Sequence, residues 1–275
     1  MMHIERDSFA AELTERPSTL RVVSWNIARG SNLNAVIEFL AAAEADIILL
    51  QETDRNARRT SHRNIAREIA LKLRLHYVFG CEFEELAQGS RVLPAYTGQA
   101  TLSRGPLSGC SILRFHKQSG FWRPRWFIPT IGLLQRRRGG RMALVSEVLN
   151  PGRTLLAYNL HCESRGSDEL RLCQLQEFLD DADRYPLDAP VIAAGDFNFD
   201  VSRPPAAAAL GRAGFLNPFA TLQEPTSCSP TRAERCRIID WILLRGPLIP
   251  ANPQVHNSVD ASDHYPLSLT VHFSS

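Results

Sequence analysis

The stretch Val191-Ile-Ala-Ala-Gly-Asp-Phe-Asn198 joins a buried strand to a pair of polar residues. Val191–Ala194 is a short apolar run of strand character, and Gly195–Asn198 follows it directly. Residues two positions apart in an extended chain point to the same side, so Asp196 and Asn198 should lie side by side. In that arrangement the carboxylate can orient a water molecule and the amide can donate to a phosphoryl oxygen. The alternative interpretation is an Asx-turn that ends the strand.

This strand closes a strand–helix–strand unit that occurs twice in the chain. The second copy, Thr154–Asn198, has His161 after its first strand; the first copy, Leu20–Glu52, has Asn26 after its first strand. Function in open α/β sheets gathers outside the carboxyl ends of the strands. Two such units facing each other would therefore bring both polar sets to one rim. Considered alone, Asn26 is typical of an Asn that ends a strand in a turn, and His161 is typical of a structural histidine at a strand end.

The other predicted elements follow from short apolar runs. A further helix begins at about Ser61, and strands are predicted at Tyr77–Phe79, Tyr96–Ser103, Ile112–Phe115, Met142–Val148, Ile238–Leu244 and Leu267–Phe273. Residues 1–19 mix charges with scattered apolar positions, and we expect a tail or a short docking helix there. Residues 20–275 should form one domain, because no Ser/Gly-rich or Pro-rich linker divides them and 44% of the chain is hydrophobic.

The composition argues against several classes of protein. The formal net charge is +2, without the bulk basic character of a nucleic-acid-binding protein. The N-terminus lacks the pattern of a signal peptide, and no stretch approaches the roughly 18 apolar residues of a membrane span. We therefore expect a cytoplasmic enzyme with reduced cysteines. The alternative is an exported protein, in which Cys228 and Cys236 could form a disulfide.

Several carboxylates lie next to apolar strands, where burial of a charged group without a partner is unfavourable. The apolar strand Asp46–Leu50 ends in Gln51-Glu52, and a carboxylate at the end of such a buried strand needs an ionic partner or a metal ion. Mg²⁺ prefers one or two carboxylates together with water and substrate phosphate, which Glu52 and Asp263 would supply. Asp240 leads into another apolar strand. If it bonds to His264, the residue after Asp263, it fixes the tautomer of that imidazole.

Short motifs follow one another in a fixed order between about residues 20 and 273. They are Trp25-Asn26, Leu50-Gln51-Glu52, Gly98-Gln-Ala-Thr-Leu-Ser-Arg104, Asn159-Leu160-His161, Gly195-Asp196-Phe197-Asn198, Ile239-Asp240-Trp241 and Ser262-Asp263-His264. In this order the chain resembles the endonuclease/exonuclease/phosphatase superfamily. That superfamily includes deoxyribonuclease-I-like nucleases, class II apurinic endonucleases, sphingomyelinases, inositol phosphatases and 5′-tyrosyl-DNA phosphodiesterases. The resemblance implies an α/β fold, a four-layer α-β-β-α sandwich of two packed mixed β-sheets flanked by helices.

The same resemblance implies a metal-dependent hydrolase. By it, Glu52 binds Mg²⁺ or Mn²⁺, with Asn26 and Asp263 close to the ion. The metal and the hydrogen-bond donors around it would stabilise charge that develops on the phosphoryl group.

The resemblance also implies catalytic roles for five residues. Asp196 would orient the attacking water, and Asn198 would hold a phosphate oxygen. Asp240 would pair with a histidine, while His161 and His264 would flank the scissile phosphate.

Four further positions resemble, or depart from, the motifs of single branches of the superfamily. Tyr96 resembles the phosphate-contacting tyrosine of the apurinic endonucleases; the alternative is a core aromatic residue. Ala28 stands where that branch has an Asp. An additional acidic residue of the deoxyribonuclease-like branch corresponds to Glu82 or Glu84. His161-Cys162-Glu163-Ser164 is similar to a segment of the tyrosyl-DNA phosphodiesterases.

Phe121–Arg141 is the segment that suggests a substrate class, because it interleaves Trp and Phe with Arg. It suits stacking on unpaired bases with phosphate contacts, an interfacial loop at a phospholipid surface, or a crossover whose Arg stems cover apolar surface. We expect a divalent-metal-dependent phosphodiesterase acting on nucleic acid, as an endonuclease, an exonuclease or a DNA-end-processing enzyme. The alternatives are a sphingomyelinase-like phospholipid hydrolase or a hydrolase of small phosphate esters, and a non-catalytic binding module on the same scaffold. No obligate protein partner is indicated, and we expect a monomer.

Overall fold

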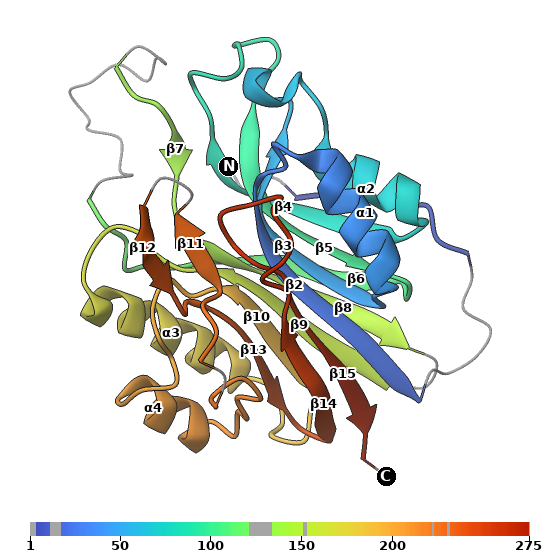
Figure 1. Ribbon diagram of the computed structural model, residues 1–275, viewed down its shortest axis with the longest axis vertical. Helices are drawn as coiled ribbons and strands as arrows, with labels where there is room; N and C mark the ends of the chain where they lie inside the picture. The colour runs from blue at the N-terminus through green and yellow to red at the C-terminus, as the bar shows by residue number, and fades with distance from the viewer. Residues whose placement is uncertain are drawn as a thin grey trace.

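The apolar runs of the sequence form two β-sheets that pack face to face, with helices on both outer surfaces (Figure 1). The computed structural model describes residues 4–11, 18–120, 134–150, 153–221, 223–229 and 232–274. The predicted α/β four-layer sandwich is confirmed. No helix among these residues is long and apolar enough to cross a lipid bilayer.

The first sheet has one parallel pair of strands near its centre, and antiparallel strands extend it on both sides. Listed by spatial order, its strands are β1 (Ile4–Ser8), β4 (His76–Glu84), β5 (Tyr96–Ser103), β3 (Ile47–Arg55), β2 (Thr19–Arg29), β15 (Leu267–Phe273) and β14 (Leu248–Val255), with β7 (Arg138–Gly139) also beside β4. Strands β2 and β3 are parallel, and the other pairs in this sheet are antiparallel. The sheet is therefore mixed, as predicted.

The second sheet is smaller, and a separate hairpin lies outside both. The second sheet runs in the order β13 (Asp240–Arg245), β10 (Val191–Asp196), β9 (Arg153–His161), β8 (Met142–Asn150) and β6 (Leu107–Arg114). The hairpin pairs β11 (Ser227–Ser229) with β12 (Arg232–Arg237). The helices are α1 (Leu33–Ala43), α2 (Ile65–Leu73), α3 (Asp168–Ala182) and α4 (Ala206–Arg212), with a 3₁₀ turn at Arg58–Thr60. Helices α1 and α2 cover the first sheet, and α3 and α4 cover the second (Figure 1).

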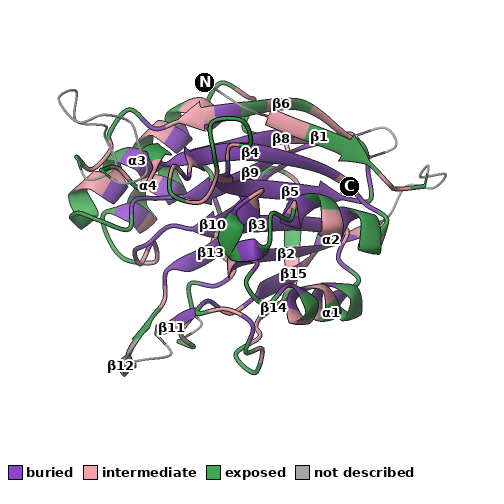
Figure 2. Ribbon diagram, turned by 90° about the horizontal axis from the view of Figure 1, so that it is seen from above, coloured by how far each residue is buried: buried purple, intermediate pink, exposed green. Residues whose placement is uncertain are grey.

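Both faces of the central strands are buried, which explains their continuous apolar runs. Val22 and Leu49 point into the core between the two sheets, whereas Val23 and Ile48 point to the core beneath α1 and α2. In Figure 2 the strands between the two pairs of helices are accordingly buried along most of their length. The two sheets are also joined by polar contacts: Gln51 Nε2 donates to Asn159 Oδ1 across the interface at 2.8 Å.

The N-terminal segment differs from the prediction of a tail or a short docking helix. Ile4–Ser8 is a strand at the edge of the first sheet, antiparallel to β4. Its Glu5 carboxylate accepts hydrogen bonds from Asn64 Nδ2 and Tyr77 Oη, both at 2.6 Å, and ion-pairs with Arg55. These contacts explain why so polar a segment docks as a strand.

The helix predicted from about Ser61 begins later, at Ile65, because the Asn64 side chain accepts a hydrogen bond from the Arg67 N–H and acts as its N-cap. Residues 121–133 of the segment expected to contact substrate lie outside the described residues. Arg138–Gly139 from the same segment forms β7.

Candidate active site

Asp196 is the last residue of β10 and lies between two other predicted site residues. Its backbone pairs with His161 of β9 on one side and with Asp240 of β13 on the other. Gly195 allows this close approach, since its φ is +146° and a Cβ there would lie 1.9 Å from the Leu160 carbonyl oxygen. The register of the second sheet therefore holds the three functional groups side by side.

One oxygen of Asp196 is the meeting point of side chains from both sheets. Asn26 Nδ2, on β2 of the first sheet, donates to Asp196 Oδ2 at 3.2 Å. The Nε2 atoms of His161 and His264 lie 3.6 Å and 3.8 Å from the same oxygen. All four residues are buried. Residues that are distant in the sequence thus form one compact constellation.

Asn198 follows β10 in a left-handed conformation, with φ 60°. Its backbone N–H donates to Asp196 Oδ1 at 2.9 Å, and its side-chain Nδ2 donates to the Cys162 carbonyl oxygen at 3.1 Å. The Asx-turn considered as an alternative is therefore present. The turn engages Oδ1 of Asp196, while Oδ2 faces the two histidines.

The imidazole of His264 is held by a carboxylate, as the sequence predicts. Its Nδ1 lies 2.9 Å and 3.0 Å from the two oxygens of Asp240, and its backbone carbonyl accepts a hydrogen bond from Trp25 Nε1 at 2.8 Å. Burial alone would lower the pKa of His264, but the carboxylates of Asp240 and Asp196 raise it to about 10. His264 is therefore a cation at neutral pH, suited to hold a negatively charged phosphoryl oxygen.

Thr226 is a site residue that the sequence analysis missed. Its hydroxyl donates to Asp240 Oδ2 at 2.7 Å and accepts the backbone N–H groups of Ile239 and Asp240, both at 3.0 Å. The hydroxyl thus fixes the Asp240 carboxylate that orients His264. No motif or spacing signals this role, because Thr226 precedes Asp240 by a whole hairpin.

That hairpin, β11–β12, contacts the segment that carries Asp263 and His264. Ser227 forms a β-bridge with His264, and the Cys228 N–H donates to the Asp263 carbonyl oxygen at 2.9 Å. The Tyr265 N–H in turn donates to the Thr226 carbonyl oxygen at 2.7 Å. The hairpin therefore braces the loop that presents His264.

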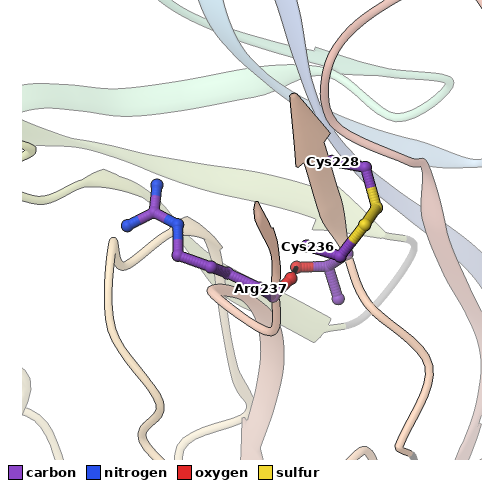
Figure 3. Close-up of a disulfide and its surroundings, with 4 residues drawn as sticks. Cys228, Cys236 and Arg237 are labelled. Carbon is purple, nitrogen blue, oxygen red and sulfur yellow. Dashed lines mark hydrogen bonds between the residues drawn. A yellow bond between two sulfur atoms is a disulfide. The ribbon is translucent and has the colours of Figure 1, made fainter. Parts of the chain in front are cut away.

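A disulfide closes this hairpin and corrects the expectation that all six cysteines are reduced. Cys228 and Cys236 face each other across the two strands and form a disulfide (Figure 3). The side chain of Arg237 extends away from the disulfide in the same view. The pairing follows from the strand register, which places the two cysteines opposite each other.

His161 is held by a buried ionic group that consists of Glu82 and Arg141. Glu82 Oε2 lies 3.0 Å from His161 Nδ1, and Arg141 Nη1 donates to Glu82 Oε1 at 2.7 Å. Burial opposes ionisation of Glu82, but His161 and Arg141 lower its pKa to about 2. Of the two acidic residues considered from the sequence, Glu82 is the one that pairs with His161. Glu84 ion-pairs with Arg138 at the surface.

A pocket of about 330 Å³ opens beside this constellation. Its lining includes the three residues predicted to surround a metal ion, Asn26, Glu52 and Asp263, together with Arg29 and His264. Burial opposes ionisation of Glu52, but the Arg29 guanidinium holds the pKa of that carboxyl below its usual value. Two carboxylates and an amide oxygen at an open pocket fit a hard divalent cation, which keeps several of its waters.

Backbone bulges aim these residues into the pocket. The parallel register of β2 and β3 shifts between Asn26 and Arg29, and Glu52 lies at φ 51° where β3 also shifts against β5. Bulges of this kind redirect side chains at sheet rims. Asp196, Asp240 and His264 form a second group whose ligand atoms lie within 4.8 Å of one another. Because His264 Nδ1 faces Asp240, this group already satisfies itself by hydrogen bonding.

Tyr96 lies at the same end of the first sheet but in a different setting. It starts β5 opposite Arg55, whose guanidinium stacks over its ring at 5.7 Å, and it packs against the core beneath α1 and α2. Burial is the main cause that raises the pKa of its hydroxyl. Its predicted contact with substrate phosphate stays a prediction.

Residues 23–264 match the Endonuclease/Exonuclease/phosphatase family. The chain therefore belongs to this family, which confirms the resemblance seen in the motifs, and it is a member of a family of phosphoester hydrolases.

Solved structures share this fold at low sequence identity. One is the endonuclease/exonuclease/phosphatase from Beutenbergia cavernae DSM 12333, 19% identical, with a TM-score of 0.69 over 94% of this chain and 72% of that one. TDP2 from Caenorhabditis elegans is 16% identical, with a TM-score of 0.60 over 92% and 74% of the two chains. ANGEL2, described as a 2′,3′-cyclic phosphatase, is 16% identical, with a TM-score of 0.60 over 92% and 95%. No curated protein sequence matches the chain. These likenesses show the fold.

Proposed function

We propose that the protein is a divalent-metal-dependent phosphodiesterase that hydrolyses phosphoester bonds in nucleic acid. The observation that carries this proposal is the convergence of Asn26, His161 and His264 on Asp196 Oδ2, at 3.2 to 3.8 Å. Attack of water on a phosphoryl group requires a carboxylate to accept the proton of the water, and hydrogen-bond donors and a cation to stabilise the phosphoryl oxygens. This site brings these groups together.

Each of these side chains has a definite part in the proposed reaction. Asp196 Oδ2 orients the attacking water and accepts its proton as the new bond to phosphorus forms and the bond to the leaving oxygen breaks. His264, held as a cation by Asp240, and His161, held by Glu82, donate to the phosphoryl oxygens. Both positioning carboxylates are buried, so the two imidazoles are fixed before substrate arrives.

The metal would be held by Glu52 and Asp263, with Asn26 beside them. A bound Mg²⁺ or Mn²⁺ supplies Lewis-acid neutralisation of the phosphoryl charge. The oxygen-rich lining of the pocket next to His264 supports this assignment. Support for nucleic acid as substrate comes from the similarity of residues 161–164 to tyrosyl-DNA phosphodiesterases and from the structural likeness to TDP2.

The test uses purified full-length protein with Mg²⁺ or Mn²⁺ on bis(4-nitrophenyl) phosphate, single- and double-stranded DNA, and sphingomyelin vesicles. We expect hydrolysis of the aryl diester and of DNA, and a loss of about 10²-fold or more in kcat for Asp196→Asn and His264→Ala. Asp188→Asn and His116→Ala change the same residue types at exposed positions and should retain activity.

Each alternative has its own signature in this panel. Hydrolysis of sphingomyelin without hydrolysis of DNA would replace nucleic acid by phospholipid as the substrate. A wild-type protein that is inert on every substrate would favour the non-catalytic binding module. Full activity in excess chelator would refute the metal assignment.

A further inference from the structure

The turn that precedes α1 has an uncommon backbone. Ala28, Arg29 and Gly30 are consecutive residues with positive φ, at 44°, 71° and 71°. Such conformations are unfavourable for residues other than glycine, because Cβ comes close to the backbone. They persist where the surroundings hold them, often at ligand sites. The Ala28 N–H donates to Asn26 Oδ1 at 3.1 Å, and the Gly30 N–H donates to the Ile27 carbonyl oxygen at 2.8 Å. The strained turn is therefore tied directly to the site residue Asn26.

This turn places the Arg29 guanidinium at the pocket with its donors mostly unused. The side chain is 39% exposed, and its Nη2 lies 3.4 Å from Glu52 Oε2 in an ion pair. No hydrogen bond joins the guanidinium to another residue within the described part of the chain, and Nε is shielded from solvent without a partner. A guanidinium offers five N–H donors in a planar fork that matches a phosphate group.

The charges of the pocket indicate an anionic partner for Arg29. Glu52 and Asp263 supply two negative charges, which one divalent cation would balance. Arg29 is then a surplus positive charge whose carboxylate partner is shared with the cation. Ala28 and Ser31, its neighbours in the lining, are too small to cover the guanidinium. A phosphate group of the substrate satisfies both the charge and the free donors.

The location of Arg29 separates this phosphate from the one that is cleaved. The scissile phosphate must lie within reach of His161 and His264, which meet at Asp196. Arg29 instead faces Glu52, its ion-pair partner among the described residues. The pocket is continuous between the two places, because the same lining contains both Arg29 and His264.

We propose that Arg29 is a specificity-determining residue that binds a second phosphate group, adjacent to the scissile one. The inference rests on the proposed function and narrows its substrate class to esters with neighbouring phosphates, such as a nucleic-acid strand. A diester with a single phosphate leaves Arg29 without this contact.

A catalytic comparison tests the second phosphate. The substrates are the thymidine dinucleotide with no terminal phosphate and the same dinucleotide with a 5′- or a 3′-phosphate. Wild type should cleave the internal bond of one phosphorylated form preferentially. Arg29→Gln should lower kcat/KM for that form by about 10- to 100-fold and change the unphosphorylated form by less than about threefold. Arg29→Lys should recover part of the preference, and the exposed Arg212→Gln should match wild type.

Equal losses on all three dinucleotides would place Arg29 at the scissile phosphate and overturn the inference, as would no loss at all. Titration of Mn²⁺ by calorimetry provides a readout that does not depend on turnover. Because Arg29→Gln removes a cation beside Glu52, it should bind Mn²⁺ at least as tightly as wild type. Weaker Mn²⁺ binding would mean that Arg29 builds the metal site, which would also overturn the inference.

Binding of labelled oligothymidylate separates this inference from the proposed function. In the inactive Asp196→Asn background with saturating Mg²⁺, the slope of log K against log salt should become shallower by about 0.7 when Arg29 is also replaced by Gln. If the wild-type protein is catalytically inert but this difference in slope is present, the proposed function is wrong and Arg29 still contacts phosphate. Identical slopes would show that Arg29 does not contact phosphate, even if the enzyme is active.

Discussion

Replacing Glu82 by Gln tests whether a buried ionic group holds His161. Glu82 is 1% exposed and faces both His161 and Arg141. Its pKa falls from 4.5 to about 2 in the folded protein, and at about 1.4 kcal/mol per pH unit this difference is worth about 3 kcal/mol. Glu82→Gln should therefore lower the free energy of unfolding by about that amount, because Arg141 and His161 lose the buried carboxylate that both of them face.

The effect has a definite pH dependence. Since the folded pKa of Glu82 is depressed, its stabilisation is present above pH 4.5 and is lost as the pH falls from 4.5 towards 2. The difference between wild type and Glu82→Gln should thus be constant between pH 5 and 7 and should shrink below pH 4.5. Hydrolysis should fall as well, because His161 loses the charge that orients it.

Chemical denaturation at a series of pH values, with thermal melts, measures this prediction. For 275 residues a loss of about 3 kcal/mol corresponds to a Tm lowered by about 5 °C. Glu84→Gln is the matched control, because Glu84 lies two residues away on β4 and pairs with Arg138 at the surface; it should cost less than about 1 kcal/mol. A Glu82→Gln variant as stable as the control at pH 7 would refute the reasoning.

Three further perturbations, two substitutions and the reduction of a disulfide, test the residues that support the site. Thr226→Val removes the hydroxyl that donates to the buried Asp240 carboxylate and accepts two backbone N–H groups. The free energy of unfolding should fall by about 2–3 kcal/mol and kcat should also fall. Thr226→Ser keeps the hydroxyl and should restore both quantities. Reduction of the Cys228–Cys236 disulfide should lower both the stability, by roughly 2 kcal/mol, and kcat. A Cys228→Ser/Cys236→Ser variant should no longer respond to dithiothreitol. Unchanged kinetics after verified reduction would contradict the role of the hairpin in supporting His264. Gly195→Ala puts a Cβ against a carbonyl oxygen and should abolish soluble folded protein, whereas Gly211→Ala, in open space, should express normally.

The parts of the site that the sequence predicted are those with a local signal. Asp196 and Asn198 follow an apolar run at a recognisable spacing. Asp196 ends β10 as predicted, whereas Asn198 lies beyond the strand in a turn, at φ 60°, and not in the extended chain that the prediction assumes. The sequence predicts Glu52 at a strand end. It lies instead in a bulge within β3, because the register shift that redirects it arises from pairing with β5, which local sequence does not encode.

The parts that sequence reasoning missed depend on contacts between distant segments. Glu82 and Glu84 both alternate with apolar residues on one strand, and a register shift between Cys81 and Phe83 is what sets Glu82 apart. β1 and the β11–β12 hairpin are too polar to show an apolar strand pattern. Thr226 acts through a hairpin that only the folded chain brings near Asp240.

The division of the site between two sheets has a consequence for how the protein acquires activity. Asn26 belongs to the first sheet and Asp196 to the second, and the hydrogen bond from Gln51 to Asn159 joins the sheets beneath them. Neither sheet alone contains a complete set of groups. Recovery of hydrolysis during refolding would therefore time the docking of one sheet onto the other, whereas far-UV circular dichroism would report when the strands form. A delay between the two signals would measure the lifetime of an intermediate with formed strands and no catalytic centre.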